Sequence, residues 1–227
     1  MELQQYKFQL MLKSLLQRVY ELYLKRATAG AEIDHILLVL TANDIKDQEG
    51  ILKLKQFIEW SFNLSIHSVA IYISMNNDNS VGVRASEIGE KIFEELGSID
   101  GGLSIYSHGS YRVNDSKGNK PYNVEISIGL GGRDELVYAT RKIMEEVKAG
   151  HITPEEIDEK LIESKLIFNF TPDLIIRSGT TKLTDFLIWQ AVYSELYFTD
   201  VSWVNFRKID FLRAVRDFKK RERRFGR

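Results

Sequence analysis

The sequence predicts a single α/β domain built on a central, mostly parallel sheet of six strands flanked by helices. Short apolar runs suited to buried strands alternate along the chain with segments of helical periodicity. This alternation favours the α/β class, because parallel neighbours in a sheet require crossover connections, which are usually helices. The 227 residues, of which 44% are hydrophobic and 28% charged, suffice for one domain with a substantial core.

The charge balance and residue usage exclude several classes of protein. A net charge of −1 gives no general attraction to nucleic acid, so we expect no nucleic-acid partner. Without cysteine, the chain has no disulfide, no thiolate nucleophile and no zinc–thiolate site. We find neither a signal peptide nor an apolar run long enough to span a bilayer, and therefore expect a cytoplasmic protein.

The N-terminal segment has the pattern of an amphipathic helix over residues 6–26. We therefore divide the chain into a helical segment, residues 1–30, and a domain, residues 31–227. The helix has more lysines and arginines than acids, which permits two interpretations: it packs on the domain, or it makes peripheral contact with a membrane surface. Its apolar face would hold Phe8, Met11, Leu12, Leu15, Val19, Leu22 and Tyr23.

The first half of the domain contains three predicted strands and two predicted helices. Strands are expected at residues 36–40, 68–73 and 103–106, where aliphatic residues cluster in short runs. Helices are expected at residues 51–63 and 84–96, where apolar residues recur every three or four positions. These segments give the strand–helix alternation from which the fold class follows.

The second half begins with turn-forming residues. We predict a loop over residues 113–123, because aspartate, glycine and proline fall within it, and a strand over residues 124–128. A helix is expected at residues 133–149. Another helix is expected to start within residues 152–157, with Thr153 as its N-cap.

A candidate anion site follows, within residues 172–200, PDLIIRSGTTKLTDFLIWQAVYSELYFTD. A buried strand at residues 174–176 leads into Arg177 and a run of hydroxyl residues. An arginine and hydroxyl groups beyond a strand end, before a helix, are typical of an anion site in an open α/β sheet.

The chain is completed by two further helices and one strand. Thr184 and Asp185 can cap the first of these helices. The strand is predicted at residues 196–198, with Glu195 at its entrance. The last helix is predicted over residues 206–221.

The stretch at residues 172–200 resembles the C-terminal signature of the cis-prenyltransferases, the undecaprenyl and dehydrodolichyl diphosphate synthases. The run FLIWQAVYSELYFTDVSWVNF follows the family pattern almost residue for residue. The resemblance implies a dimeric α/β protein that acts in polyprenyl diphosphate synthesis from isopentenyl diphosphate. It also implies isoprenoid diphosphates as ligands and Mg²⁺ as cofactor.

Within the signature, the resemblance implies a site for isopentenyl diphosphate. Arg177 matches the first arginine of the family, whereas Lys182 and Thr184 replace its second arginine and its serine. Lysine neutralises a phosphate but lacks the planar fork of arginine. Glu195 stands where the family has a carboxylate ligand of Mg²⁺.

The first strand departs from the family pattern at the position of the essential aspartate. The family pattern there includes I-M-D-G-N, and the segment LLVLTAND places Thr41 where the aspartate belongs. Threonine is a weak Mg²⁺ ligand and does not neutralise the ion. The following loop has one lysine against three acids, and this net negative charge repels a diphosphate. We therefore expect no catalytic residue in this chain.

The C-terminus resembles the R-R-F-G ending of the family. In family members the R-x-G part reaches across the dimer interface and completes the substrate site of the partner. The resemblance thus implies that Arg224 and Gly226 bind isopentenyl diphosphate held mainly by another subunit.

These retained and lost motifs resemble the non-catalytic, Nogo-B-receptor-type subunit of heteromeric cis-prenyltransferases. We expect an accessory subunit that is inactive alone, with Mg²⁺ shared with or held by a catalytic partner. Two alternatives remain open. One is an active homodimeric synthase with a non-standard metal site, and the other is an isoprenoid diphosphate-binding protein without a synthase role.

Overall fold

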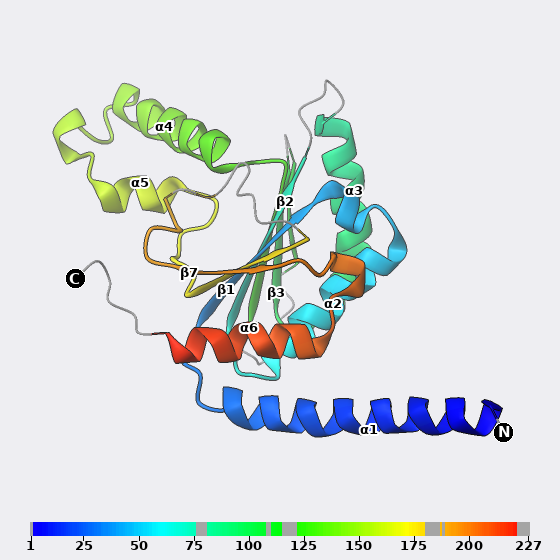
Figure 1. Cartoon of the computed structure of the whole chain (residues 1–227). Helices are drawn as coiled ribbons and strands as arrows, with labels where there is room; N and C mark the ends of the chain where they lie inside the picture. The colour runs from blue at the N-terminus through cyan, green and yellow to red at the C-terminus, as the bar shows by residue number, and fades with distance from the viewer. Residues whose placement is uncertain are drawn as a thin grey trace.

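The structure, a computed structural model, describes residues 2–75, 81–107, 110–114, 122–179, 187 and 189–221. Within these residues one sheet runs in the order β4-β3-β5-β2-β1-β6-β7 (Figure 1). Six strands are parallel to their neighbours, and β4 pairs antiparallel with β3 at one edge. The strands are β1 (His35–Thr41), β2 (Ser68–Ser74), β3 (Gly102–Ser107), β4 (Ser110–Asn114), β5 (Asn123–Ile128), β6 (Leu174–Ser178) and β7 (Glu195–Thr199).

The helices connect these strands and cover both faces of the sheet (Figure 1). The α-helices are α1 (Glu2–Thr28), α2 (Gln48–Phe62), α3 (Val81–Leu96), α4 (Gly132–Lys148), α5 (Glu159–Lys165) and α6 (Lys208–Lys220). Short 3₁₀ turns are η1 (Ala42–Ile45), η2 (Pro154–Glu156) and η3 (Trp203–Asn205). The predicted α/β fold with six parallel strands is confirmed. The division of the chain at residue 30 stays a prediction, although α1 includes the whole predicted helical segment, residues 6–26.

The larger apolar core lies between the sheet and the helices α2, α3 and α6. Every second residue of the central strands points into it, as Ile36, Leu38 and Leu40 do from β1. The intervening residues of β1, Leu37 and Val39, face a smaller core on the opposite side. The two faces of the sheet therefore pack against different apolar cores, and neighbouring residues of a strand point into opposite ones.

Three predictions about local structure are wrong. A loop was predicted over residues 113–123, but its first residues belong to β4. This strand forms by pairing with β3 at the edge of the sheet, and a local residue pattern does not reveal such pairing. The helix predicted to start within residues 152–157 is wrong only in its type and length: Thr153 is the N-cap, but of the single 3₁₀ turn η2. The α-helix α5 starts at Glu159, where the Asp158 side chain accepts a hydrogen bond from the Leu161 N–H. Residues 189–193 form turns, whereas a helix was predicted there.

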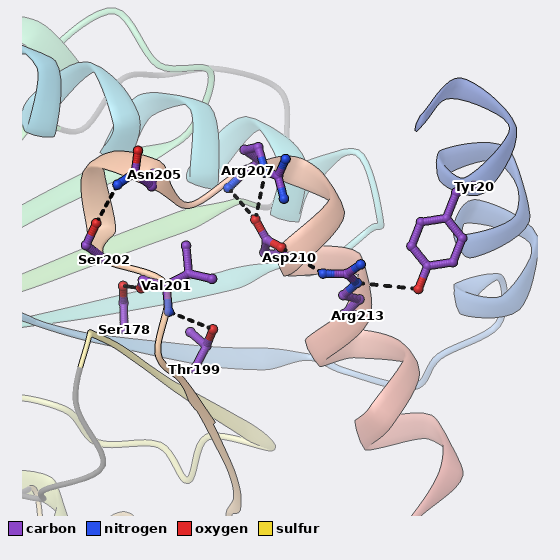
Figure 2. A network of polar contacts seen from close by, with 9 residues as sticks. All are labelled: Tyr20, Ser178, Thr199, Val201, Ser202, Asn205, Arg207, Asp210 and Arg213. Atoms are coloured by element: carbon purple, nitrogen blue, oxygen red, sulfur yellow. Dashed lines mark hydrogen bonds and ion pairs between the residues drawn. The ribbon is translucent and has the colours of Figure 1, made fainter. Parts of the chain in front are cut away.

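Helix α6 is fixed by polar contacts at its start (Figure 2). The Arg207 N–H donates to the Asp210 carboxylate at 3.1 Å, and that carboxylate also accepts from the Arg213 guanidinium at 3.2 Å. Arg213 donates in turn to the Tyr20 hydroxyl of α1 at 3.4 Å. The same network thus caps α6 and joins it to α1.

In the part of the chain that the structure describes, no helix combines the length and the apolar character that a membrane crossing requires.

Candidate functional site

Arg177 is the centre of the candidate site. It lies near the end of β6, between Val39 of β1 and Phe198 of β7, and is only 3% exposed. Its Nε and Nη1 atoms are buried and have no hydrogen-bond partner among the described residues. Buried polar atoms are nearly always hydrogen-bonded, so two unpartnered guanidinium nitrogens indicate a missing acceptor.

The electrostatic surroundings of Arg177 also favour an anion. Burial lowers the pKa of the guanidinium, while the nearby Asp44 carboxylate and Tyr72 oppose this effect. Arginine nevertheless keeps its charge in proteins. A buried cation of this kind is stabilised by a ligand that supplies charge and acceptors together, as a phosphate group does.

The chain beyond Arg177 turns sharply at the carboxyl edge of the sheet. The Ser178 hydroxyl donates to the Val201 carbonyl at 2.7 Å (Figure 2), and the Gly179 N–H donates to the Thr199 carbonyl at 2.9 Å. Gly179 has a φ of +75°, a conformation that favours glycine. These bonds fix the backbone of Ser178 and Gly179 directly after Arg177.

Thr41 ends β1 at the same edge. Its hydroxyl donates to the Asp44 carboxylate at 2.7 Å, and its N–H donates to the same oxygen at 2.8 Å. Both groups therefore serve the turn η1. The geometry gives Thr41 a structural role in this turn.

The turn after β1 packs directly on α2. A Cβ built on Gly50 would lie 2.1 Å from the Asp44 carbonyl oxygen, so any other residue there would displace the turn. Asp47 is the N-cap of α2, and Lys46 lies 3.9 Å from its carboxylate. An acidic residue already occupies the helix N-terminus, where a diphosphate would otherwise be favoured.

Glu195 lies far from Arg177. It is the first residue of β7 and pairs with Leu174, three positions before Arg177, which corresponds to about 10 Å along the strand. Its carboxylate accepts from Arg221 at 2.9 Å, near the end of α6. The structure therefore does not bring Glu195 and Arg177 together within one chain.

The other predicted site residues, Lys182, Thr184, Arg224 and Gly226, lie outside the described residues. Their roles stay predictions.

Comparisons with known proteins place this geometry in a family. The prenyltransferase family model, described as undecaprenyl diphosphate synthase, matches residues 104–226. A tritrans,polycis-undecaprenyl-diphosphate synthase (geranylgeranyl-diphosphate specific) of Methanocaldococcus jannaschii is 36% identical over 203 residues, which cover 78% of this chain and 72% of the relative. The synthase of the same name from Methanopyrus kandleri is 32% identical, with 93% of each chain covered.

The chain belongs to the cis-prenyltransferase family. A solved structure agrees: the lavandulyl diphosphate synthase from Lavandula x intermedia, in complex with dimethylallyl diphosphate, has a TM-score of 0.72 at 26% identity. The match covers 87% of this chain and 99% of that one.

The described part of this cis-prenyltransferase does not fit Mg²⁺ by itself. No group of three or more acidic or histidine side chains gathers there in a way that could hold a metal ion. Thr41 bonds to Asp44, and the Glu195 carboxylate is neutralised by Arg221. The carboxylates that Mg²⁺ requires are thus separated or already paired.

Two signature residues have structural roles that the sequence did not reveal. The buried Gln190 donates to the Glu135 carboxylate and to the Phe168 carbonyl, both at 2.9 Å. The Asp173 carboxylate accepts from the backbone of Asp34 at 2.9 Å, where the chain enters β1. Their place inside the signature was the available signal, but only the fold identifies their partners.

The face of the sheet under α2 and α3 is filled by side chains. A Cβ on Gly89 of α3 would lie 3.5 Å from Ile128 and 3.6 Å from Ile105, so helix and strands are in close contact. A cleft of about 800 Å³ lies instead beside α4 and α5, lined among others by Tyr106, Leu130 and Tyr138. This cleft is on the opposite side of the sheet from α2 and α3.

Proposed function

We propose that this chain is the accessory subunit of a heteromeric cis-prenyl diphosphate synthase. It is catalytically incomplete alone and donates Arg224 and Gly226 to the substrate site of a catalytic partner. The observation that carries the proposal is the hydrogen bond of 2.7 Å from the Thr41 hydroxyl to Asp44. At the position of the family aspartate, this chain has a neutral group already engaged in a turn.

The surroundings of Arg177 are the basis on which we propose a substrate for the complex. Its buried, unpartnered nitrogens suit the diphosphate of isopentenyl diphosphate, and Lys182 and Thr184 would complete that site. Relatives are named for the synthesis of undecaprenyl diphosphate with geranylgeranyl diphosphate. Geranylgeranyl diphosphate is therefore the first allylic substrate to test.

The proposed cofactor, Mg²⁺, is held mainly by the catalytic partner. Glu195 would bind this ion only in an assembly in which Arg221 releases its carboxylate. The proposal needs no Mg²⁺-dependent step on this chain alone.

The proposed assembly is a dimer with a catalytic subunit or with a second copy, built largely from residues 183–206 and the C-terminal arm. Val192 and Tyr193 support this assembly. They are large apolar side chains just before β7, and they are 66% and 57% exposed, respectively. We further propose that the protein meets membranes only peripherally, through α1.

The test is elongation of geranylgeranyl diphosphate by this chain alone, by an aspartate-containing synthase from the same source, and by the two together. We expect activity of the mixture and none of this chain alone. Arg224→Ala should lower the catalytic efficiency of the mixture about 10- to 150-fold, the loss expected for one hydrogen bond to a charged group. An unchanged rate of the assembled variant complex would contradict the proposal.

One observation favours the alternative of an active homodimer. Asp44 lies near Arg177 at the carboxyl edge and could act as a non-standard metal ligand. Turnover by the purified chain, abolished in Asp44→Asn, would establish this alternative. Diphosphate binding without turnover in any mixture would establish the third possibility, a binding protein without a synthase role.

A further inference from the structure

Helix α1 carries a continuous apolar surface that no described residue covers. Its members are leucine, methionine, valine and tyrosine side chains that are between 44% and 63% exposed. We call this surface the α1 stripe, and it consists of Met11, Leu12, Leu15, Leu16, Val19, Leu22 and Tyr23.

The stripe points away from the rest of the molecule. The opposite side of α1 packs on α6 through the fully buried Leu24 and through Tyr20. With 3.6 residues per turn, the centre of the stripe lies about 130° around the helix axis from these contacts. Figure 1 shows α1 along one border of the molecule, with α6 between it and the sheet.

Polar contacts oppose a rotation of α1 that would bury the stripe. The Tyr20 hydroxyl accepts from Arg213 at 3.4 Å (Figure 2), and the Tyr20 ring centroid lies 5.3 Å from the Arg213 guanidinium. The same hydroxyl also accepts from Arg216 at 3.5 Å. The Lys219 ammonium donates to the Ala29 carbonyl at 2.5 Å just after α1. The stripe thus stays outward while the C-terminal end of α1 is held on α6.

The charges of α1 decide between a lipid surface and a second copy of the helix. The helix has five basic and two acidic residues, a net charge of +3, whereas the whole chain has −1. Arg18 and Lys25 lie along one border of the stripe, so two copies packed stripe to stripe would bring like charges together. An anionic lipid surface instead attracts these cations and accepts the apolar side chains.

We infer that α1 lies in the headgroup region of a membrane that contains anionic lipids, with the α1 stripe facing the acyl chains. This inference rests on the peripheral membrane contact proposed above and names its lipid and its contact residues. Binding depends on two features of α1. The α1 stripe inserts among the lipids, and Arg18 and Lys25 along its border select anionic headgroups.

The experiment is flotation of the full chain, without substrate or partner, with vesicles of phosphatidylcholine alone or mixed with phosphatidylglycerol. We expect binding to the mixed vesicles to exceed binding to the neutral ones by roughly tenfold, and to fall with added salt. Leu15→Gln with Val19→Gln should reduce binding roughly tenfold or more. Arg18→Gln with Lys25→Gln should remove the preference for phosphatidylglycerol.

A matched control is Val137→Gln with Met144→Gln, which makes the same chemical change at exposed positions of α4. This control should bind like the wild type, and circular dichroism should show equal helix content in all variants. Equal binding of the stripe and control variants would overturn the inference. So would a wild-type dimer that the stripe variant alone turns into monomers, because a second copy would then cover the stripe.

The synthase assay with the mixed subunits is independent of this result. Failure of flotation with an active mixture rejects only the lipid contact. Lipid binding with an inactive mixture rejects only the accessory-subunit function.

Discussion

Arg221 holds Glu195 by a hydrogen bond of 2.9 Å and, with the same nitrogen, donates to the Leu196 carbonyl, also at 2.9 Å. Its other nitrogens bond to Asp217 at 2.6 and 3.1 Å. The hydrogen bond to Glu195 is the main reason that the pKa of Arg221 is raised. The last described residue of the chain is thus fixed between β7 and α6, and the proposed arm leaves from this point.

Removal of this pair should have a small effect on stability. We expect Arg221→Ala to lower the free energy of unfolding by about 0.5–1 kcal/mol, because the pair is partly exposed and screened. A double-mutant cycle with Glu195→Ala, measured by urea unfolding, should give a coupling of the same size. Strict additivity of the two single changes would show that the pair contributes nothing.

Arg177 should lower the stability of the unliganded protein and, at the same time, strengthen the binding of isopentenyl diphosphate. Arg177→Met should raise the free energy of unfolding by about 1–2 kcal/mol, because a buried charge with unpartnered nitrogens is replaced by an apolar chain. The same variant should weaken isopentenyl diphosphate binding by the mixed complex roughly tenfold or more. The measurements are urea unfolding and calorimetric titration.

The exposed Lys160→Met is the control for Arg177→Met and should change neither quantity. Loss of stability in Arg177→Met would indicate that the guanidinium has a structural partner in the native chain.

The buried carboxyl of Glu135 and the partly buried carboxyl of Glu125 should make stability fall as pH rises. Burial raises the pKa of Glu125 and of Glu135, and the charge of Glu135 raises the pKa of Glu125 further. Such a carboxyl binds its proton more tightly in the folded state. Its contribution to stability is therefore complete below pH 4.5, the ordinary pKa of the group, and is lost as the pH rises from there through the higher pKa of the folded state. Glu125→Gln should therefore flatten this decline and stabilise the protein at neutral pH.

The Glu125 prediction is measured by urea unfolding at a series of pH values, with the exposed Glu94→Gln as control. Parallel curves for wild type and Glu125→Gln would contradict it. The glutamine keeps an oxygen for the Asn123 side-chain N–H, which donates to Glu125 at 2.8 Å, so lost packing is not expected.

Trp203 should be a major contributor to stability. It is fully buried against Phe57 and Phe206, and its indole N–H donates to the Gly50 carbonyl at 3.0 Å. Trp203→Phe should lower the free energy of unfolding by about 2–3 kcal/mol, because it leaves that carbonyl without its donor and creates a void.

The control for Trp203 is Trp189→Phe, because Trp189 is only half-buried and its indole N–H donates an exposed hydrogen bond to Glu163 at 3.3 Å. It should cost less than about 1 kcal/mol in the same unfolding experiment. Equal losses would show that burial of Trp203 does not determine its effect.

The main elements of the fold could be predicted from local pattern. β1 is a continuous aliphatic run, and α6 repeats apolar residues every three or four positions, so each was recognisable alone. β4 could not be recognised, because its strand character depends on pairing with β3 at a sheet edge. The turn at Thr153 carries the right capping residues but continues for only one turn before the chain extends.

The candidate site could be predicted only in part. The position of Arg177 after an apolar strand indicated an anion site, but the absence of described partners for its nitrogens is a property of the folded chain. The separation of Glu195 from Arg177 follows from the register of β6 with β7, which the sequence does not display. The Arg221–Glu195 pair joins residues 26 positions apart and likewise depends on the packing of α6.

The packing of Gly50 against the Asp44 carbonyl limits what a single substitution at position 41 can achieve. An aspartate at position 41 would place a second carboxylate beside that of Asp44, where Thr41 donates a hydrogen bond of 2.7 Å. The turn cannot shift to relieve this repulsion, because α2 begins directly against it. Thr41→Asp alone would therefore destabilise the turn η1, and a carboxylate at this position requires a second, compensating change nearby.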